Sequence, residues 1–271
     1  AILSASARDG WLFGCDRDPA AVAATRERLQ AFAGRFELRE GDFVNVTAWV
    51  ALASFDGVLA DLGISSVQLD DPARGFSFTH DGPLDMRLSP KQTLTAAQLV
   101  NEADEHELAR IFWQLGGERA GRRVARAIIR ERAHQQLTTT SQLAALIARA
   151  IPRVERGIHP ATRCFLGLRR AVNDEAEALD RGLPAAWQIL KPGGRMAIIS
   201  FHSAEDRQVK EFGRALARDY VAGSDADVPE LRRPRPAQAR WVNRKAIRPS
   251  AAEVAANPRA RSAQLRVLEK R

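Results

Sequence analysis

Short apolar runs alternate with helical patterns in the first quarter of this chain of 271 residues. The runs WLFGCD (11–16), RFELRE (35–40) and DGVLADLG (56–63) predict strands. Between them, DPAAVAATRERLQAF predicts a helix with Asp18 as its N-cap and Pro19 at its first position, and VNVTAWVALA predicts a short helix. This alternation predicts an α/β domain with a parallel sheet.

The alternation is interrupted between about Pro72 and Arg170. A loop rich in Gly, Phe and Asp (RGFSFTHDGPLDMR) is followed there by helical periodicity. The α/β order then resumes with a helix in NDEAEALDRGLPAAWQIL, a turn at KPGG, a strand over Arg195 to Phe201 and a helix in SAEDRQVKEFGRALARD. ELRRPRPAQARWVNRKAIRP predicts a loop or a partly disordered segment, and SAQLRVLEK predicts a closing strand.

The composition narrows the class of protein. Hydrophobic residues make up 45% of the chain, which predicts a packed core. The net charge of +8 favours a polyanionic partner, although a genome that prefers Arg codons would explain part of the excess. The two cysteines form no CxxC pair, and no apolar run approaches the ~20 residues that span a membrane. We therefore expect a cytoplasmic protein without a disulfide framework.

Carboxylates follow two of the predicted strands. Asp16 and Asp61 each end an apolar run, and ligands of doubly wound sheets bind at the carboxyl ends of the strands. A carboxylate there can accept hydrogen bonds from a ribose diol. Ser65, Ser66 and Gln68 follow Asp61, so we predict a polar pocket floor on one rim of the sheet. The alternative is that both aspartates are only helix caps or turn residues, although Asp18 is better placed to cap the first helix.

Two further residues are weaker candidates for this pocket. Phe43 in EGDFVN follows a strand, where its ring could lie against an adenine, but a Phe in that place is usually a core residue. His202 in SFHS follows the strand that ends at Phe201, although a single His more often has a structural role. The five histidines show no metal-ligand spacing, so no metal site is predicted.

The segment RAGRRVARAIIRER places basic residues on one stripe of a helix, with small and apolar residues on the other side. A solvated basic face is the ordinary interpretation. An uninterrupted row of arginines favours contact with nucleic-acid phosphates instead. The predicted stripe consists of Arg119, Arg122, Arg123, Arg126 and Arg130.

Taken together, these segments resemble the RsmH/MraW family almost from end to end. The resemblance lies in DRDPAA, ADLGISSVQLDDPARGFSFTHDGPLDMRLSP, GGERAGRRVARAII, HPATRCFLGLRRAVNDEAEAL, LKPGGRMAIISFHSAEDRQVKEF and NPRARSAQLRVLEK, in this order. Members of this family use S-adenosyl-L-methionine (SAM) to methylate N4 of a cytidine in the decoding centre of bacterial 16S rRNA.

The resemblance implies a class I SAM-methyltransferase Rossmann-like fold with an inserted all-helical domain. We expect residues 1–71 and 171–271 to form the Rossmann-like domain and residues 72–170 the inserted domain, which would recognise the RNA. The family's first strand and its Gly-rich loop, which wraps the methionine end of the cofactor, would lie ahead of this chain and are absent from it.

The resemblance also implies roles for individual residues. It places Asp16 at the cofactor ribose, Phe43 beside the adenine, and Asp61 and Gln68 elsewhere in the cofactor pocket. Asp61, with the Ser65 and Ser66 loop, is the candidate for a catalytic role next to the amine. In the GFSF loop, Phe76 and Phe78 would stack on bases.

The expected partner is 16S rRNA or the small ribosomal subunit, with no membrane, and the oligomeric state stays open, a dimer included. The rival hypothesis is a non-catalytic RNA-binding or ribosome-assembly protein on a degenerate Rossmann-like scaffold. That rival does not explain the spacing of the carboxylates and Gln68. A nucleotide-dependent dehydrogenase would need a GxGxxG motif, which the chain lacks.

Overall fold

The computed structural model of the protein describes residues 1–151, 159–222 and 228–271. Residues 152–158 of the predicted inserted domain therefore lie outside the described residues. The chain forms two compact units, one of Ala1–Gly41 with Ile64–Glu175, the other of Asp42–Gly63 with Ala176–Arg271. The boundaries that the sequence suggested for an inserted domain stay a prediction. Within the described ranges, no helix combines the length and the apolar character that crossing a membrane requires.

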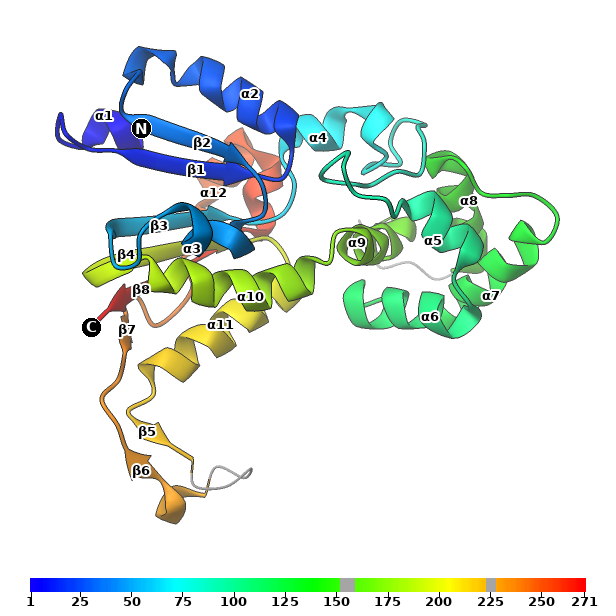
Figure 1. The fold of residues 1–271 in the computed structure, drawn as a ribbon. Coiled ribbons are helices and arrows are strands. Elements are labelled where there is room, and N and C mark those ends of the chain that lie inside the picture. Colours follow the sequence, from blue (N-terminus) through cyan, green and yellow to red (C-terminus); the bar gives the residue numbers. More distant parts are fainter. Residues whose placement is uncertain (152–158, 223–227) are drawn as a thin grey trace. The chain divides into compact units, whose positions relative to one another are not determined.

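The first unit begins with two parallel strands and a helix between them (Figure 1). After the short α1 (Ile2–Ala5), β1 (Leu12–Asp16) pairs with β2 (Phe36–Glu40), and α2 (Pro19–Arg28) connects them, followed by η1 (Gln30–Phe32). The Asp18 side chain accepts a hydrogen bond from the Ala20 N–H at the start of α2. The predicted strands, helix and N-cap are therefore confirmed.

The rest of the first unit is helical and has its own core (Figure 1). Phe112, Ile128, Leu143, Ile147 and Leu168 are fully buried in this core. The elements are α4 (Ser66–Asp70), η3 (Pro72–Arg74), α5 (Ala96–Glu102), α6 (Glu105–Arg110), the π-helix η4 (Ile111–Leu115), α7 (Gly121–Arg132), α8 (Thr140–Ala150) and α9 (Ala161–Val172). The helical periodicity of this region is thus confirmed.

The second unit is built on a sheet with the order β3-β4-β8-β7. β3 (Phe55–Asp61) and β4 (Leu190–Ser200) are parallel, whereas β8 (Gln264–Lys270) and β7 (Ala239–Trp241) are antiparallel to their neighbours. Leu183, Val209 and Leu268 belong to its core. Its other elements are η2 (Phe43–Asn45), α3 (Val46–Trp49), α10 (Glu175–Gln188), α11 (Ser203–Ala217), β5 (Tyr220–Val221), η5 (Pro229–Leu231), β6 (Arg233–Pro234), α12 (Ala251–Ala256) and η6 (Pro258–Ser262).

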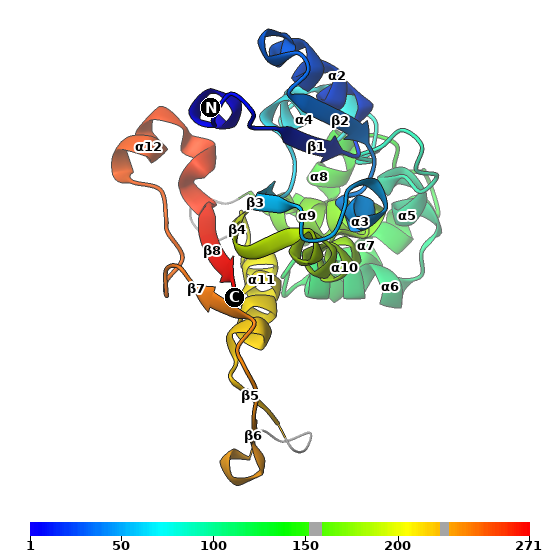
Figure 2. The same ribbon diagram turned by 60° about the vertical axis from the view of Figure 1, so that its left-hand side comes forward.

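Three details differ from the sequence prediction. The sheet is not a single parallel one: among the described strands, β1 and β2 pair only with each other, and β8 returns antiparallel. The KPGG segment lies within β4, where a register shift opposite β3 absorbs the extra residues. The Pro- and Arg-rich stretch contains β6 and β7, and β6 pairs with β5 in a hairpin that stands away from the four-stranded sheet (Figure 2).

Candidate functional site

Asp16 is the last residue of β1, and its carboxylate is held by the backbone that follows it. The Asp18 N–H donates to Asp16 Oδ1 at 2.8 Å, and the residue is exposed. Partial desolvation of the carboxylate raises the pKa of Asp16 above its usual value, against the opposing effect of the Asp18 N–H. An exposed carboxylate of fixed orientation at a strand end is able to accept hydrogen bonds from a diol.

Asp18 lies in a buried network that joins the start of α2 to α4 and η3. Only 2% of the residue is exposed, and its Oδ2 accepts hydrogen bonds from Gln68 Nε2 and from Arg74 Nη1, both at 2.7 Å. Burial acts to raise the pKa of Asp18, but the hydrogen bonds from Arg74, Gln68 and the Ala20 N–H outweigh it and hold the pKa below its usual range. Because Asp18 also supplies the N–H that fixes Asp16, this network positions the candidate ligand residue.

Gln68 has a structural contact at both ends of its amide. Its Oε1 accepts from the Ser65 N–H at 2.8 Å, while Ser65 Oγ accepts from the Gln68 N–H at 3.2 Å, which forms a capping box at the start of α4. Ser66, the first residue of α4, is exposed. Gln68 thus connects α4 to Asp18, and the direct cofactor contact and the catalytic roles of Ser65 and Ser66 stay predictions.

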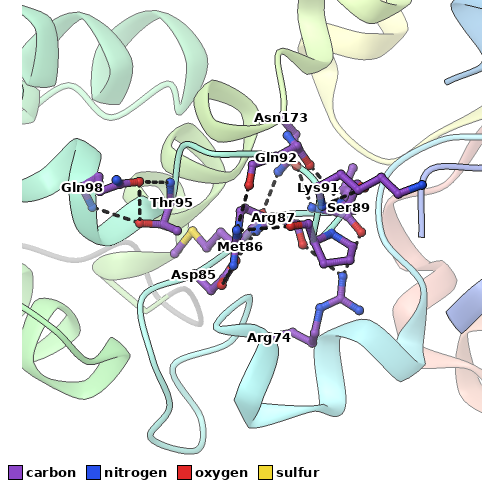
Figure 3. Close-up of polar contacts among 12 residues, drawn as sticks. Arg74, Asp85, Met86, Arg87, Ser89, Lys91, Gln92, Thr95, Gln98 and Asn173 are labelled. Carbon is purple, nitrogen blue, oxygen red and sulfur yellow. Dashed lines mark hydrogen bonds and ion pairs between the residues drawn. The ribbon is translucent and has the colours of Figure 1, made fainter. Parts of the chain in front are cut away.

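Arg74 continues the network into the loop of Asp85 to Gln92 (Figure 3). Its Nη2 donates to the carbonyl oxygens of Arg87 and Leu88, each at 3.0 Å. The Asp85 carboxylate forms an ion pair with Arg87, with 2.7 Å between Oδ2 and Nη2. Between these two residues, the buried Met86 has a φ of 61°, a conformation that is rare for a residue with a Cβ. The surrounding contacts hold this strained backbone in place.

The same loop is also held by a residue outside it, Asn173, and by an ion pair of its own Lys91 (Figure 3). The buried Asn173 donates from Nδ2 to Met86 O and accepts from the Leu88 N–H, both at 2.8 Å. Lys91 Nζ lies 2.7 Å from Glu40 Oε1 at the end of β2. Arg74 and Asn173 were not predicted as positioning residues, because nothing in the local sequence indicates partners so far away along the chain.

Phe43 and Asp61 belong to the second unit. Asp61 ends β3 as predicted, and partial burial of its carboxylate raises its pKa. Since Asp16 and Asp61 lie in separate sheets and in separate units, the single rim that the sequence suggested stays a prediction. The Phe43 ring lies against α10 at Gly182, where a Cβ would overlap the ring.

Replacing Gly182 by alanine should therefore displace Phe43. We expect a loss of about 1–3 kcal/mol in the free energy of unfolding, the usual cost of overpacking a filled site. Denaturant unfolding of Gly182→Ala measures this loss of stability. Gly193→Ala would be a poor control, because Gly193 has a φ of +80° and an alanine there would strain the backbone. Ala185→Gly on the same helix is the better control, since it creates no overlap and should cost only about 1 kcal/mol through the lower helix propensity of glycine. An unchanged stability of Gly182→Ala would show that the ring moves aside without cost.

His202 is the N-cap of α11 and not an open pocket residue. Its Nδ1 accepts from the Glu205 N–H at 3.3 Å, and its Nε2 lies 2.8 Å from Glu205 Oε1. Glu205 is buried and also accepts from the Phe201 N–H at 3.0 Å. The spacing of His202 and Glu205, a cap residue and an acid three positions later, is the local pattern from which this pairing could have been predicted.

The arginine stripe is largely confirmed as an exposed face of α7. Arg122, Arg123, Arg126 and Arg130 lie on this helix and are exposed. One detail was wrong: Arg119 precedes the helix, because α7 begins at Gly121. From the neighbouring α6, Glu105 lies 2.9 Å from Arg126 Nε.

The predicted stacking role of Phe76 does not agree with its burial. Phe76 is 6% exposed and belongs to the helical core. Phe78 is partly buried, with its ring centroid 4.8 Å from that of Phe165 and 4.6 Å from that of His159. Because the GFSF loop lies over the helical core, Phe76 is packed inside this core and Phe78 packs against it. Burial therefore speaks against stacking on a base for Phe76, and the stacking role of Phe78 stays a prediction.

The order of strands and helices, the parallel strand pairs and the carboxylates that end β1 and β3 define a Rossmann-like α/β protein. The model of the MraW methylase family matches residues 1–271. The chain belongs to this family and is an enzyme of the methyltransferase class.

Several relatives are similar over nearly all of the chain. The Ribosomal RNA small subunit methyltransferase H of Syntrophotalea carbinolica is 47% identical over 274 residues, which cover 99% of this chain and 87% of the relative. Proteins of the same name from Rhodospirillum centenum and Thermomicrobium roseum are each 46% identical, and both alignments cover 100% of this chain. They cover 82% of the first relative and 83% of the second. This similarity confirms the family that the sequence motifs suggested.

Proposed function

We propose that this protein transfers a methyl group from SAM to N4 of a cytidine in the decoding centre of bacterial 16S rRNA. The observation that carries the proposal is the exposed Asp16 carboxylate, oriented by the Asp18 N–H at the end of β1, in a chain that belongs to a methylase family throughout. The relatives are named for the small-subunit RNA, which supports this RNA as the substrate.

The residues present fit a nucleoside-bearing cofactor. Asp16, in the first unit, can accept hydrogen bonds from the two hydroxyl groups of a ribose. The contact of Phe43 with an adenine stays a prediction, since this residue belongs to the second unit. When bound, SAM supplies a methyl group activated by the positive charge on its sulfur. The protein's task is then to hold the base in line with that methyl group and to exclude water.

Asp61 is the candidate for contact with the base. The exocyclic amine of cytosine is a weak nucleophile, because its lone pair is delocalised into the ring. A carboxylate that accepts a hydrogen bond from this amine favours the tetrahedral and more nucleophilic form of the nitrogen. Asp61 ends β3 with a carboxylate of raised pKa, and the hydroxyl groups of Ser65 and Ser66 follow it along the chain.

The exposed arginines of α7 would hold the RNA backbone. Arg122, Arg123, Arg126 and Arg130 present guanidinium groups that can contact phosphates. A target cytidine must leave its stack to react, at a cost of a few kcal/mol, and backbone contacts of this kind offset that cost.

The ribose assignment is tested by replacing Asp16 with alanine. We expect SAM to bind about 10- to 100-fold more weakly, since hydrogen bonds to a charged group contribute about 1.5–3 kcal/mol each. RNA affinity should be unchanged. Isothermal titration of SAM into Asp16→Ala, wild type and Asp9→Ala measures the effect, with Asp9 as an exposed aspartate outside the strands. Wild-type affinity in Asp16→Ala would refute the assignment.

A further inference from the structure

An exposed tryptophan lies in a basic groove of the first unit. Trp113 is 56% exposed, although Ile111 and Phe112 beside it in the π-helix η4 are 1% and 0% exposed. Trp113 lines a groove of about 720 Å³. The basic side chains that line this groove with it are His106, Arg110, Arg119, Arg122, Arg123, Arg126 and Arg130. We name this site the Trp113 groove.

The position of Trp113 is fixed by close packing of the backbone. A Cβ at Gly121 would lie 3.2 Å from Ala109 O and from Phe112 Cβ, and 3.3 Å from Trp113 N. The first turn of α7 therefore lies directly on the π-helix, which brings Arg122 and Trp113 to the same groove. Short π-helical segments are frequent at functional sites, and a rigid backbone beneath an aromatic residue lowers the entropic cost of ordering it on binding.

The chemistry of the groove matches unpaired nucleotides. A large exposed aromatic ring is a platform on which a base stacks, and guanidinium groups next to it bind the phosphates on either side. Among the described residues that line the groove, none is acidic. Glu105 is the acid that contacts one of its arginines, at 2.9 Å from Arg126 Nε. An RNA duplex keeps its bases stacked, so the exposed indole favours a single strand.

We propose that the Trp113 groove binds a single-stranded segment of the RNA substrate, with one unstacked base against the indole of Trp113. This proposal rests on the proposed function, since it specifies which form of the RNA the arginines of α7 hold. It also replaces the stacking role that the sequence suggested for Phe76, whose ring is packed in the helical core.

The test compares Trp113→Ala with Trp113→Phe. Binding of a single-stranded RNA oligonucleotide and of a duplex of the same sequence is measured by filter retention or fluorescence anisotropy. We expect Trp113→Ala to bind the single strand about tenfold more weakly, with little change for the duplex, and Trp113→Phe to retain most of the affinity. Trp11→Ala is the matched control, because Trp11 is 46% exposed and does not line the groove.

Three results would overturn the proposal: wild-type affinity of Trp113→Ala for the single strand, an equal loss for the duplex, or a change of oligomeric state that accounts for the loss. Methyl transfer by the wild type separates this proposal from the proposed function. If transfer occurs and Trp113→Ala binds normally, only the groove assignment fails. If the single strand binds through Trp113 but the wild type neither binds SAM nor methylates RNA, the groove stands and the proposed function fails.

Discussion

Replacing Asp18 by alanine should lower the free energy of unfolding by about 3 kcal/mol, the lower end of the cost of breaking a buried ion pair. The substitution removes the acceptor of Gln68 Nε2 and Arg74 Nη1, and it also removes the N-cap of α2. The backbone N–H that orients Asp16 is kept in this variant, but the side-chain contacts that hold that backbone in place are lost, so SAM affinity should fall as well. Denaturant unfolding and SAM titration of the same variant measure both effects.

The Asp18→Asn variant separates the effect of the charge at this position from the effect of the side chain's shape, because Asn has nearly the same shape and no charge. The pKa of Asp18 is lowered in the folded protein, so its stabilising charge is fully present above the unfolded pKa of about 3.9 and is lost as the pH falls through the folded pKa. The amide side chain of Asn does not ionise, so its contribution to stability does not change with pH in this range. The stability difference between wild type and Asp18→Asn should therefore be largest near neutral pH and shrink below about pH 4. A difference that stays constant from pH 7 to pH 3 would contradict the role of the ion pair.

Reversing the charges of Arg122 and Arg126 should have the largest effect on RNA binding. With about 1.5–3 kcal/mol for each charge-assisted contact, loss of both weakens binding by about 100-fold or more. The slope of log affinity against log salt concentration should become less steep by about two, since two phosphate contacts disappear. SAM affinity should stay at the wild-type value. Binding titrations of Arg122→Glu with Arg126→Glu over a range of salt concentrations measure this.

The control for that experiment is a second double variant, in which the net charge changes by the same amount but at a different place in the protein. Arg207 and Arg214 are exposed arginines on α11, in the second unit. Their replacement by glutamate changes the total charge by the same amount. If this pair lowered RNA affinity and the salt dependence as much as the α7 pair, the effect would come from net charge, and the arginine stripe would lose its assigned role.

Local patterns in the sequence were sufficient for much of the fold. The Asp18 and Pro19 pair predicted the start of α2 correctly, because an N-cap depends on residues within one turn. Apolar runs predicted β1, β2, β3 and β8, and helical periodicity predicted α7 and α11. The carboxylates at the strand ends followed from the same runs, so Asp16 and Asp61 could be placed in the sequence before their surroundings were known.

Contacts across the chain could not be predicted in this way. The hydrogen bonds of Asp18 to Gln68 and Arg74 join residues 50 and 56 positions apart, and local sequence contains no information on such pairings. The burial of Phe76 depends in the same way on helices that come later in the chain. Trp113 is exposed where Phe76 is buried, and this could not be predicted locally either. Its exposure depends on the π-helix and on the close approach of Gly121.

We have proposed that this protein methylates N4 of a cytidine in small-subunit rRNA with SAM as the donor. The most direct test incubates the protein with SAM and small ribosomal subunits or 16S rRNA that lack the modification, and then identifies the methylated nucleoside by mass spectrometry. We predict N4-methylcytidine from the decoding centre, at a reduced rate with Asp16→Ala at subsaturating SAM. Binding of the RNA without any methylated nucleoside, or methylation of a different base, would contradict this account.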